Sequence, residues 1–387
     1  MLTRRCDIKW GLKHFVLVRG MVEVLKCGSG LYMRHSFTRI LVMMLALMMC
    51  LAGGVSAQGA WAVRDIDGVE YVKLSDVWRF YRFAPCKGRT GFVSYGSGKH
   101  VVSLQENKQD FYVNNYRYVL SHPVRKDDGE LVISSVDMRK LVDPVLRPRY
   151  TPSARLRTVV IDPGHGGHDA GAVSGIAKEK DLNLAVARKL RRRLEQQGYK
   201  VVMTRDGDYF LTLQQRVDIA NRIPDSIFVS IHHNSGRSAA SGIETFTLAP
   251  QGTTSPFARS RRFEDLAGNN QDSENIALAT AVHSRAIRSS GAIDRGIQRA
   301  RFSVLCTIRR PAILFEGGFV SNAAECRKMA TPRYQDLLAD SICKGIVAYN
   351  NTVCRPAGKV AAASTPGSGR VRTSMSGASI RNYSVKK

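Results

Sequence analysis

The strongest constraint on the fold is an alternation of apolar and amphipathic segments between residues 157 and 350. The apolar segments lack the regular polar positions of a half-exposed strand, so they predict strands buried on both faces. The expected strands begin with the run TVVIDPG and continue at 199–205, 226–234, 242–249 and 310–322. The expected helices lie at 181–197, 211–222, 273–290 and 334–350. This alternation predicts an α/β domain whose mainly parallel sheet is covered by helices on both faces.

A smaller unit at residues 63–147 has a different rhythm. Short strand-like runs alternate with hairpin-type turns, such as Gly-Ser-Gly at 96–98 and Asp-Asp-Gly at 127–129. Two short helices are expected, one of which begins near Ser75. The pattern predicts a small β-rich α+β domain, and it resembles the stalk module of exported bacterial proteins.

The start of the chain has the pattern of a signal peptide. Within residues 1–57, an apolar run from Leu41 follows two arginines and ends in the small residues Val-Ser-Ala. An ordinary leader of this kind would begin at Met33. The alternative is an uncleaved helix that anchors the protein in a membrane. Cleavage after Ala57 would leave no membrane span and predicts an exported protein of the periplasm or cell envelope.

The charge of the chain points to an anionic partner. The sequence contains 58 Lys and Arg against 32 Asp and Glu, a net charge of +26. Residues 148–156 are polar and predict a linker to the α/β domain at 157–351, and the acid-free segment 355–387 predicts a basic disordered tail. Export removes most nucleic-acid roles, which leaves an acidic polymer of the cell wall or surface, or anionic lipid, as the expected partner.

The cysteines argue against a thiolate metal site. Five would remain after cleavage, an odd number without a CxxC pair. Export permits a disulfide, either Cys343 with Cys354 or Cys306 with Cys326.

Titratable side chains cluster where the apolar strands end. Three such strands end at His165, at His232 and His233, and at Glu316. A further acid, Glu179, precedes the first helix of the domain. Because functional sites in open α/β sheets gather at strand ends, two histidines and a carboxylate would complete a catalytic zinc site, with a second carboxylate for proton transfer. The glycines around His165 would leave room for a substrate strand.

Each of these residues also has a purely structural interpretation. A histidine at a strand end is more often structural than a metal ligand, and an acid before a helix commonly interacts with the helix dipole. Glu316 is harder to explain in this way, because it lies inside an apolar run where an unpaired charge is costly. The sequence lacks the HExxH, GxSxG, Walker and GxGxxG patterns, which excludes several enzyme classes.

Seven motifs in one order carry a family resemblance. They are IDPGHGGHDAGA, KEKDLNLAVARKL, TR with a following Asp, LQQRVDIAN, FVSIHHNS, DRGIQRARFSVL and AILFEGGFVSN. Over residues 157–350 the chain resembles the zinc-dependent N-acetylmuramoyl-L-alanine amidases of the amidase_3 type. The resemblance implies a twisted sheet flanked by helices and one catalytic Zn²⁺ ion.

The resemblance also implies roles for individual residues. The zinc ligands would be His165, Glu179 and His232, and Glu316 would be the catalytic carboxylate. Four neighbours in the same motifs are not expected to bind the metal. Among them, His168 would lie at the surface or rim and Asp162 would orient the loop, whereas His233 and Asp169 receive no further role.

The implied reaction is hydrolysis of the amide between N-acetylmuramic acid and L-alanine in peptidoglycan, which releases stem peptides. Arg295, Arg299 and Arg301 precede the Glu316 strand and are candidates to bind stem-peptide carboxylates. The 63–147 unit would bind the wall or a partner, such as an activator protein. The alternatives are a zinc peptidase that cuts within the stem peptide, and a non-catalytic peptidoglycan-binding protein. Residues 250–272 look too short for a blocking helix and predict a lid or rim.

Overall fold

The computed structural model describes residues 61–150, 156–256 and 258–353. The predicted signal peptide, most of the predicted linker and the basic tail lie outside these residues. In the described ranges, no helix combines the length and the apolar character needed to cross a membrane.

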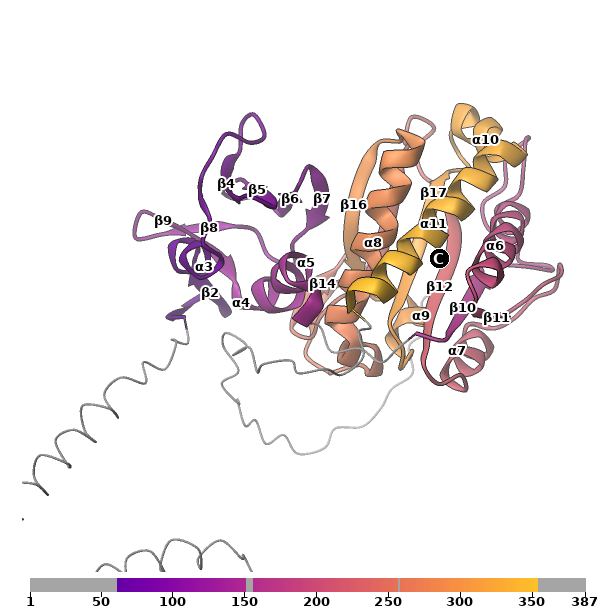
Figure 1. Ribbon diagram of the computed structural model, residues 1–387, viewed down its shortest axis with the longest axis horizontal. Coiled ribbons are helices and arrows are strands. Elements are labelled where there is room, and N and C mark those ends of the chain that lie inside the picture. Colours follow the sequence, from indigo (N-terminus) through magenta and orange to yellow (C-terminus); the bar gives the residue numbers. More distant parts are fainter. Residues whose placement is uncertain (1–60, 151–155, 257, 354–387) are drawn as a thin grey trace, which may run out of the picture. The chain divides into compact units, whose positions relative to one another are not determined.

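Six strands of the α/β domain lie side by side in the order β11-β10-β12-β17-β13-β16 (Figure 1). Their bounds in that order are Lys200–Met203, Thr158–Pro163, Ser226–Asn234, Ala312–Phe319, Ile243–Leu248 and Asp294–Ala300. β11, β10, β12 and β17 run parallel to one another, and β13 is antiparallel to β17. The mainly parallel sheet confirms the predicted fold class.

Helices cover both faces of this sheet because its strands are apolar on both sides. Successive residues of β10 point to opposite faces, so that Ile161 and Val160 enter two different hydrophobic clusters. The first cluster contains side chains of the three long helices and the second contains those of two shorter ones. The long helices are α6 (Glu179–Gln196), α8 (Asp272–Ser290) and α11 (Pro332–Val353), and the shorter ones are α7 (Leu213–Asn221) and α9 (Ser303–Cys306). A further short helix, α10 (Ala323–Met329), follows β17.

The N-terminal module, residues 61–150, is built from short strands and helices, as predicted. One sheet has the order β1-β2-β9-β8, and a second antiparallel group has the order β7-β6-β5-β4-β3. The strands are β1 (Val63–Ile66), β2 (Val69–Lys73), β3 (Ala84–Pro85), β4 (Val93–Ser97), β5 (His100–Leu104), β6 (Asp110–Val113), β7 (Tyr116–Val119), β8 (Arg125–Asp127) and β9 (Glu130–Ser134). The helical segments are α3 (Leu74–Tyr81), α4 (Ser135–Asp137), η2 (Met138–Val142), α5 (Asp143–Leu146) and η3 (Pro148–Tyr150).

The N-terminal module and the α/β domain share one sheet, which the sequence did not predict. β7 pairs in parallel with β16 through Tyr118 and Ile297, so that eleven strands form a continuous sheet. A buried ion pair of 3.0 Å joins Arg299 of β16 to Asp137 of the module. The described part of residues 60–387 groups into one compact unit. The proposed division into two domains at 148–156 stays a prediction about folding units.

The segment predicted as a lid or rim contains a hairpin. β14 (Thr253–Ser255) pairs with β15 (Ala258–Arg262), and the 3₁₀ helix η4 (Ala267–Gln271) follows. Thr253 is fully buried, so the base of the hairpin is anchored in the domain.

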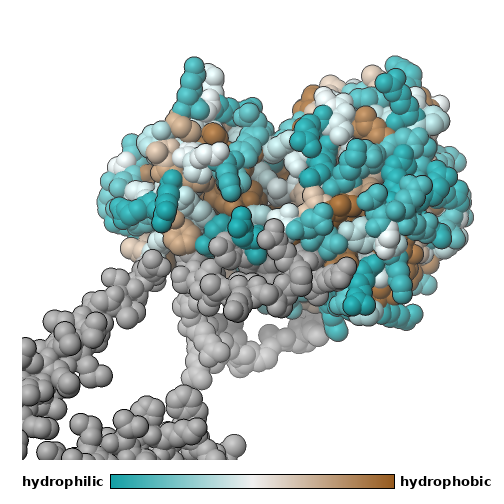
Figure 2. Space-filling view, in the orientation of Figure 1, coloured by the Kyte–Doolittle hydropathy of each residue, from teal (hydrophilic) through white to brown (hydrophobic). Residues whose placement is uncertain are grey.

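The space-filling view shows hydrophilic residues over most of the visible face of the α/β domain (Figure 2).

The cysteines of the described residues form no disulfide. Cys306 and Cys326, one of the two candidate pairs, are not bridged. Cys326 is fully buried and its Sγ lies 3.2 Å from Ser174 Oγ. The other candidate pair involves Cys354, which lies outside the described residues.

Candidate active site

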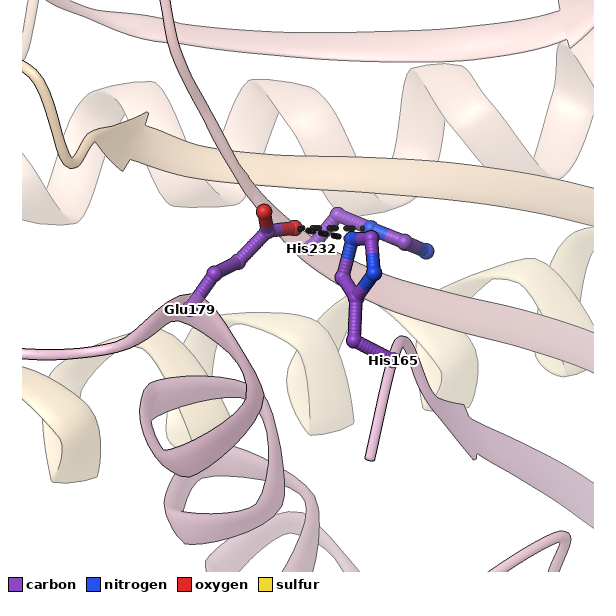
Figure 3. Close-up of side chains that lie close together, drawn as sticks. All are labelled: His165, Glu179 and His232. Carbon is purple, nitrogen blue, oxygen red and sulfur yellow. Dashed lines mark hydrogen bonds and ion pairs between the residues drawn. The ribbon is translucent and has the colours of Figure 1, made fainter. Parts of the chain in front are cut away.

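His165, Glu179 and His232 come together from three elements (Figure 3). His165 lies on the loop after β10, Glu179 is the first residue of α6, and His232 lies near the end of β12. Glu179 Oε1 is 2.9 Å from His232 Nδ1 and 3.1 Å from His165 Nε2. One ligand atom from each side chain lies within 4.8 Å of the others. The fold therefore brings together the three residues that the sequence predicted as metal ligands.

Two glycines provide the space that this cluster needs. A Cβ atom on Gly164 would lie 2.2 Å from His232 Nε2, so the imidazole ring fills the place of a side chain. A Cβ atom on Gly171 would lie 2.6 Å from both Glu179 Oε2 and His165 Cδ2, and its φ of +64° also favours glycine. The expectation that glycines near His165 make room for substrate is corrected for Gly164, because His232 occupies that space.

Contacts with two histidines hold Glu179 as a carboxylate. Burial raises the pKa of Glu179, but interactions with His165 and His232, hydrogen bonds first among them, outweigh burial and lower it overall. The other oxygen, Oε2, accepts a hydrogen bond of 2.9 Å from the amide of Ala172. A carboxylate fixed in this way can contribute a negative charge to a cation bound between the two rings.

His165 is itself oriented by a carboxylate. Its Nδ1 lies 2.8 Å from Asp169 Oδ2, which leaves Nε2 facing Glu179. A carboxylate behind a histidine fixes the ring orientation and tautomer in many metal sites. No role was expected for Asp169 from the sequence, and this supporting contact was not predicted.

The donor set fits a zinc ion. Two imidazole nitrogens and one carboxylate oxygen are a common protein ligand set for catalytic zinc, which keeps a further position for water or substrate. If both imidazoles are neutral, as metal-ligating histidines are, the buried Glu179 carboxylate lacks a matching positive charge, which is costly. A cation held between these atoms would supply that match.

Glu316 lies beside this cluster on the neighbouring strand. Its Cα is in register with that of His232 across the parallel pair β12–β17. Residues in direct register project to the same face of a sheet, about 5 Å apart, so the Glu316 and His232 side chains share one face. Glu316 is 8 % exposed. A second carboxylate is thus available next to the three candidate ligands.

Two buried arginines hold the loop that carries His165. Arg216 Nη1 donates to Asp162 Oδ1 at 2.7 Å, and its Nη2 donates to the carbonyl of His165 at 2.9 Å. Arg205, which is fully buried, donates to the carbonyls of Pro163 and Gly164. The sequence predicted an orienting role for Asp162. It assigned no role to the two arginines, although both lie in quoted motifs.

Breaking the Asp162–Arg216 pair should destabilise the protein strongly. Arg216→Met would leave the Asp162 carboxylate, only 1 % exposed, without its cationic partner. We expect the free energy of unfolding to fall by about 3–5 kcal/mol, as measured by urea denaturation. Arg192→Met, on the exposed face of α6, is the matched control and should change it by less than about 0.5 kcal/mol. Equal unfolding midpoints for the two variants would contradict this role.

The remaining histidines of the motifs lie away from the cluster. His233 is 1 % exposed, points to the opposite face from His232, and its Nδ1 lies 2.8 Å from Asn183 Oδ1. Burial lowers the pKa of His233 to about 4, so it is neutral near pH 7. His168 is exposed, as predicted for a surface or rim residue, and its ring packs against Phe210. Neither side chain belongs to the group of three candidate ligands.

The three candidate arginines have different surroundings. Arg299 is 6 % exposed and pairs with Asp137, and Arg301 Nη2 donates to the carbonyls of Pro250 and Thr253 at the base of the hairpin. These contacts indicate structural roles for Arg299 and Arg301. The side chain of Arg295 is more than a third exposed, at 37 %.

Comparisons with known proteins show which family the α/β domain resembles. The family model described as N-acetylmuramoyl-L-alanine amidase, Amidase_3, matches residues 159–348. The uncharacterized protein YqiI of Bacillus subtilis strain 168 is 37% identical over 193 residues, which cover 50% of this chain and 84% of that protein. The N-acetylmuramoyl-L-alanine amidase AmiA of Escherichia coli strain K12 is 31% identical over 229 residues, covering 52% and 79%.

Two further matches cover a smaller and a larger share of the other protein than the first two. The N-acetylmuramoyl-L-alanine amidase AmiC of Escherichia coli O6:H1 is 35% identical over 242 residues, and the match spans 58% of it. Among solved structures, the catalytic domain of CwlV, an N-acetylmuramoyl-L-alanine amidase from Bacillus (Paenibacillus) polymyxa var. colistinus, is 36% identical. The match covers 51% of this chain and 99% of that one, with a TM-score of 0.43.

Proposed function

Because the chain belongs to the Amidase_3 family of N-acetylmuramoyl-L-alanine amidases, we propose that residues 157–351 form a zinc-dependent catalytic domain. It hydrolyses the amide bond between N-acetylmuramic acid and L-alanine in peptidoglycan and releases stem peptides from the glycan. The observation that carries this proposal is the convergence of His165, Glu179 and His232 next to Glu316.

His165, Glu179 and His232 would hold the Zn²⁺ ion. The ion would supply Lewis-acid chemistry, by polarising the amide carbonyl and making water more acidic. The protein prepares this site in advance: Asp169 orients His165, and Gly164 leaves space for His232. Such a rigid setting keeps the reacting groups in place without further ordering.

Glu316 would move the proton. Its carboxylate accepts a proton from the attacking water as the new C–O bond forms, and then gives it to the nitrogen of L-alanine as the C–N bond breaks. The products are the lactyl carboxylate of the sugar and a peptide with a free amino terminus. The position of Glu316 on the same face as His232 supports this assignment.

The products of peptidoglycan digestion test the proposal. We expect mass spectrometry to find intact stem peptides that begin with L-Ala, together with glycan that has lost its peptides. Cleavage between amino acids would instead indicate a peptidase. A zinc-loaded protein that releases no product would indicate a binding protein. Either of these two outcomes would overturn the proposed reaction.

The other parts of the chain would place the enzyme at its substrate. We propose that residues 1–57 direct export to the periplasm or cell envelope, and that residues 63–147 bind the wall or a partner such as an activator protein. The net charge of +26 favours an anionic polymer such as peptidoglycan. The basic segment 355–387 would add to this attraction.

A further inference from the structure

A β-bulge turns one arginine out of the regular strand pairing near Glu316. In the pair β13–β16, Ile243 is in register with Asp294, and the next residue, Glu244, is in register with Gly296. Arg295 is therefore the extra residue of β16. Bulges commonly redirect a side chain next to a functional site. Gly296 has a φ of +95°, which a side chain would strain, so glycine stabilises this local shape.

The guanidinium of Arg295 is held by two neighbours. Its Nε donates to Glu244 Oε2 at 3.3 Å, and its guanidinium carbon lies 4.8 Å from the centroid of the Phe319 ring. Glu244 also accepts hydrogen bonds from the side-chain amides of Asn234 and Gln298, so Arg295 is not its only partner. These contacts fix the orientation of the arginine side chain and use only one of its nitrogen atoms.

The outer edge of the guanidinium remains available. Within the described residues, Nη1 and Nη2 of Arg295 donate to no protein acceptor, and 37 % of the side chain is exposed. This edge carries the parallel pair of N–H groups that binds a carboxylate through two hydrogen bonds. The site thus has the form of a carboxylate receptor that is already oriented.

The receptor lies close to the proposed reaction centre. Glu244 is directly opposite Glu316 in the antiparallel pair β13–β17, about 5 Å away between neighbouring strands. Phe319 follows Glu316 by three residues on β17 and is in register with Asn234. In an extended stem peptide, the α-carboxylate of the second residue lies roughly 7 Å from the scissile amide nitrogen. This distance is between one and two times the spacing of about 4.8 Å that separates neighbouring strands.

We propose that Arg295 binds the α-carboxylate of the second stem-peptide residue, D-glutamate, and thereby selects stems in which this group is ionised rather than amidated. This assignment rests on the proposed amidase function. Arg299 and Arg301 have no part in it, because their guanidinium groups bind Asp137 and the hairpin base.

The N-terminal module holds the bulge in place. Arg117 of β7 donates from Nη1 to the carbonyl of Arg295 at 2.6 Å, and its backbone amide donates to Asp294 Oδ2 at 2.9 Å. Asp294 also accepts from the amide of Gly296 and lies 2.9 Å from His283 Nε2. Arg117 is therefore a positioning residue, and through it the module contributes to substrate selection.

Two synthetic substrates test this inference. Both are N-acetylmuramyl-L-Ala-D-Glu with the γ-carboxylate blocked as a methylamide; one keeps the α-carboxylate and the other carries a carboxamide there. For zinc-loaded full-length enzyme, Arg295→Met should lower kcat/KM for the acid substrate by roughly tenfold to a hundredfold, mainly through KM. It should change kcat/KM for the amide substrate by less than about threefold. Arg288→Met, a cation in the last turn of α8, is the matched control.

Binding and rescue distinguish the two arginines. Calorimetric titration with the product peptide should show weaker binding of the acid form by Arg295→Met and unchanged binding of the amide form. Arg117→Met should raise KM for the acid substrate with little change in kcat, and Arg117→Lys should restore part of the loss. If Arg295→Met slows both substrates equally, the carboxylate assignment is wrong while the amidase function stands. If wild-type enzyme releases no peptide from either substrate, the proposed function itself fails.

Discussion

Replacing Glu316 with glutamine is expected to lower the rate of amide hydrolysis by about 10²–10⁴-fold while the protein keeps its metal. Glutamine has nearly the same shape but cannot accept the proton of the attacking water. Because Glu316 lies beside His232 rather than among the three candidate ligands, zinc affinity should change little. Release of stem peptides, followed by mass spectrometry, gives the rate, and elemental analysis gives the zinc content.

A matched substitution controls for the loss of one negative charge. Glu195→Gln removes an exposed carboxylate of α6 that pairs with Arg191 on the same helix. This variant should hydrolyse peptidoglycan at the wild-type rate. If Glu316→Gln retains more than about a tenth of the activity, another group must move the proton. If it loses zinc instead, Glu316 must be counted among the metal ligands.

Gly164→Ala is expected to abolish zinc binding and to reduce activity at least about 100-fold, because it displaces a metal ligand. The new Cβ atom would lie 2.2 Å from His232 Cε1 and Nε2, a distance that forces the imidazole away from Glu179. Two of the three candidate ligands would then remain in place, which is too few for a stable catalytic zinc site. Zinc content after dialysis and the rate of peptide release measure the two effects.

The control for this substitution is another loop glycine. A Cβ atom added to Gly175 would have no other atom within 4 Å, so Gly175→Ala should bind zinc and hydrolyse substrate like the wild type. Circular dichroism should show that both variants are folded. Stoichiometric zinc in folded Gly164→Ala would mean that His232 is not required to hold the ion.

Much of the site could be predicted because the fold follows from the apolar runs. Carboxyl ends of parallel strands meet at one edge of a sheet, which brings His165, His232 and Glu316 together without knowledge of any contact. The role of Glu179 came from the family resemblance, because an acid at a helix start has an ordinary electrostatic explanation. The structure adds the contacts of Asp169 and of the glycines.

The parts that could not be predicted depend on residues that look like surface residues. β16 has the sequence DRGIQRA, in which charged residues interrupt the apolar pattern and a bulge breaks the alternation. Arg205 and Arg216 are buried because they bind loop carbonyls, and no periodicity marks such arginines. Arg299 finds its partner Asp137 162 positions earlier in the chain, a pairing that a single sequence does not encode locally.

The continuous sheet also has a consequence for solubility. Without β7, the edge of β16 would expose unpaired backbone N–H and C=O groups, which is a template for association with other chains. Arg299 would at the same time lose the carboxylate that neutralises it inside the protein. The N-terminal module therefore covers the edge of β16 and so disfavours pairing of this sheet with other chains.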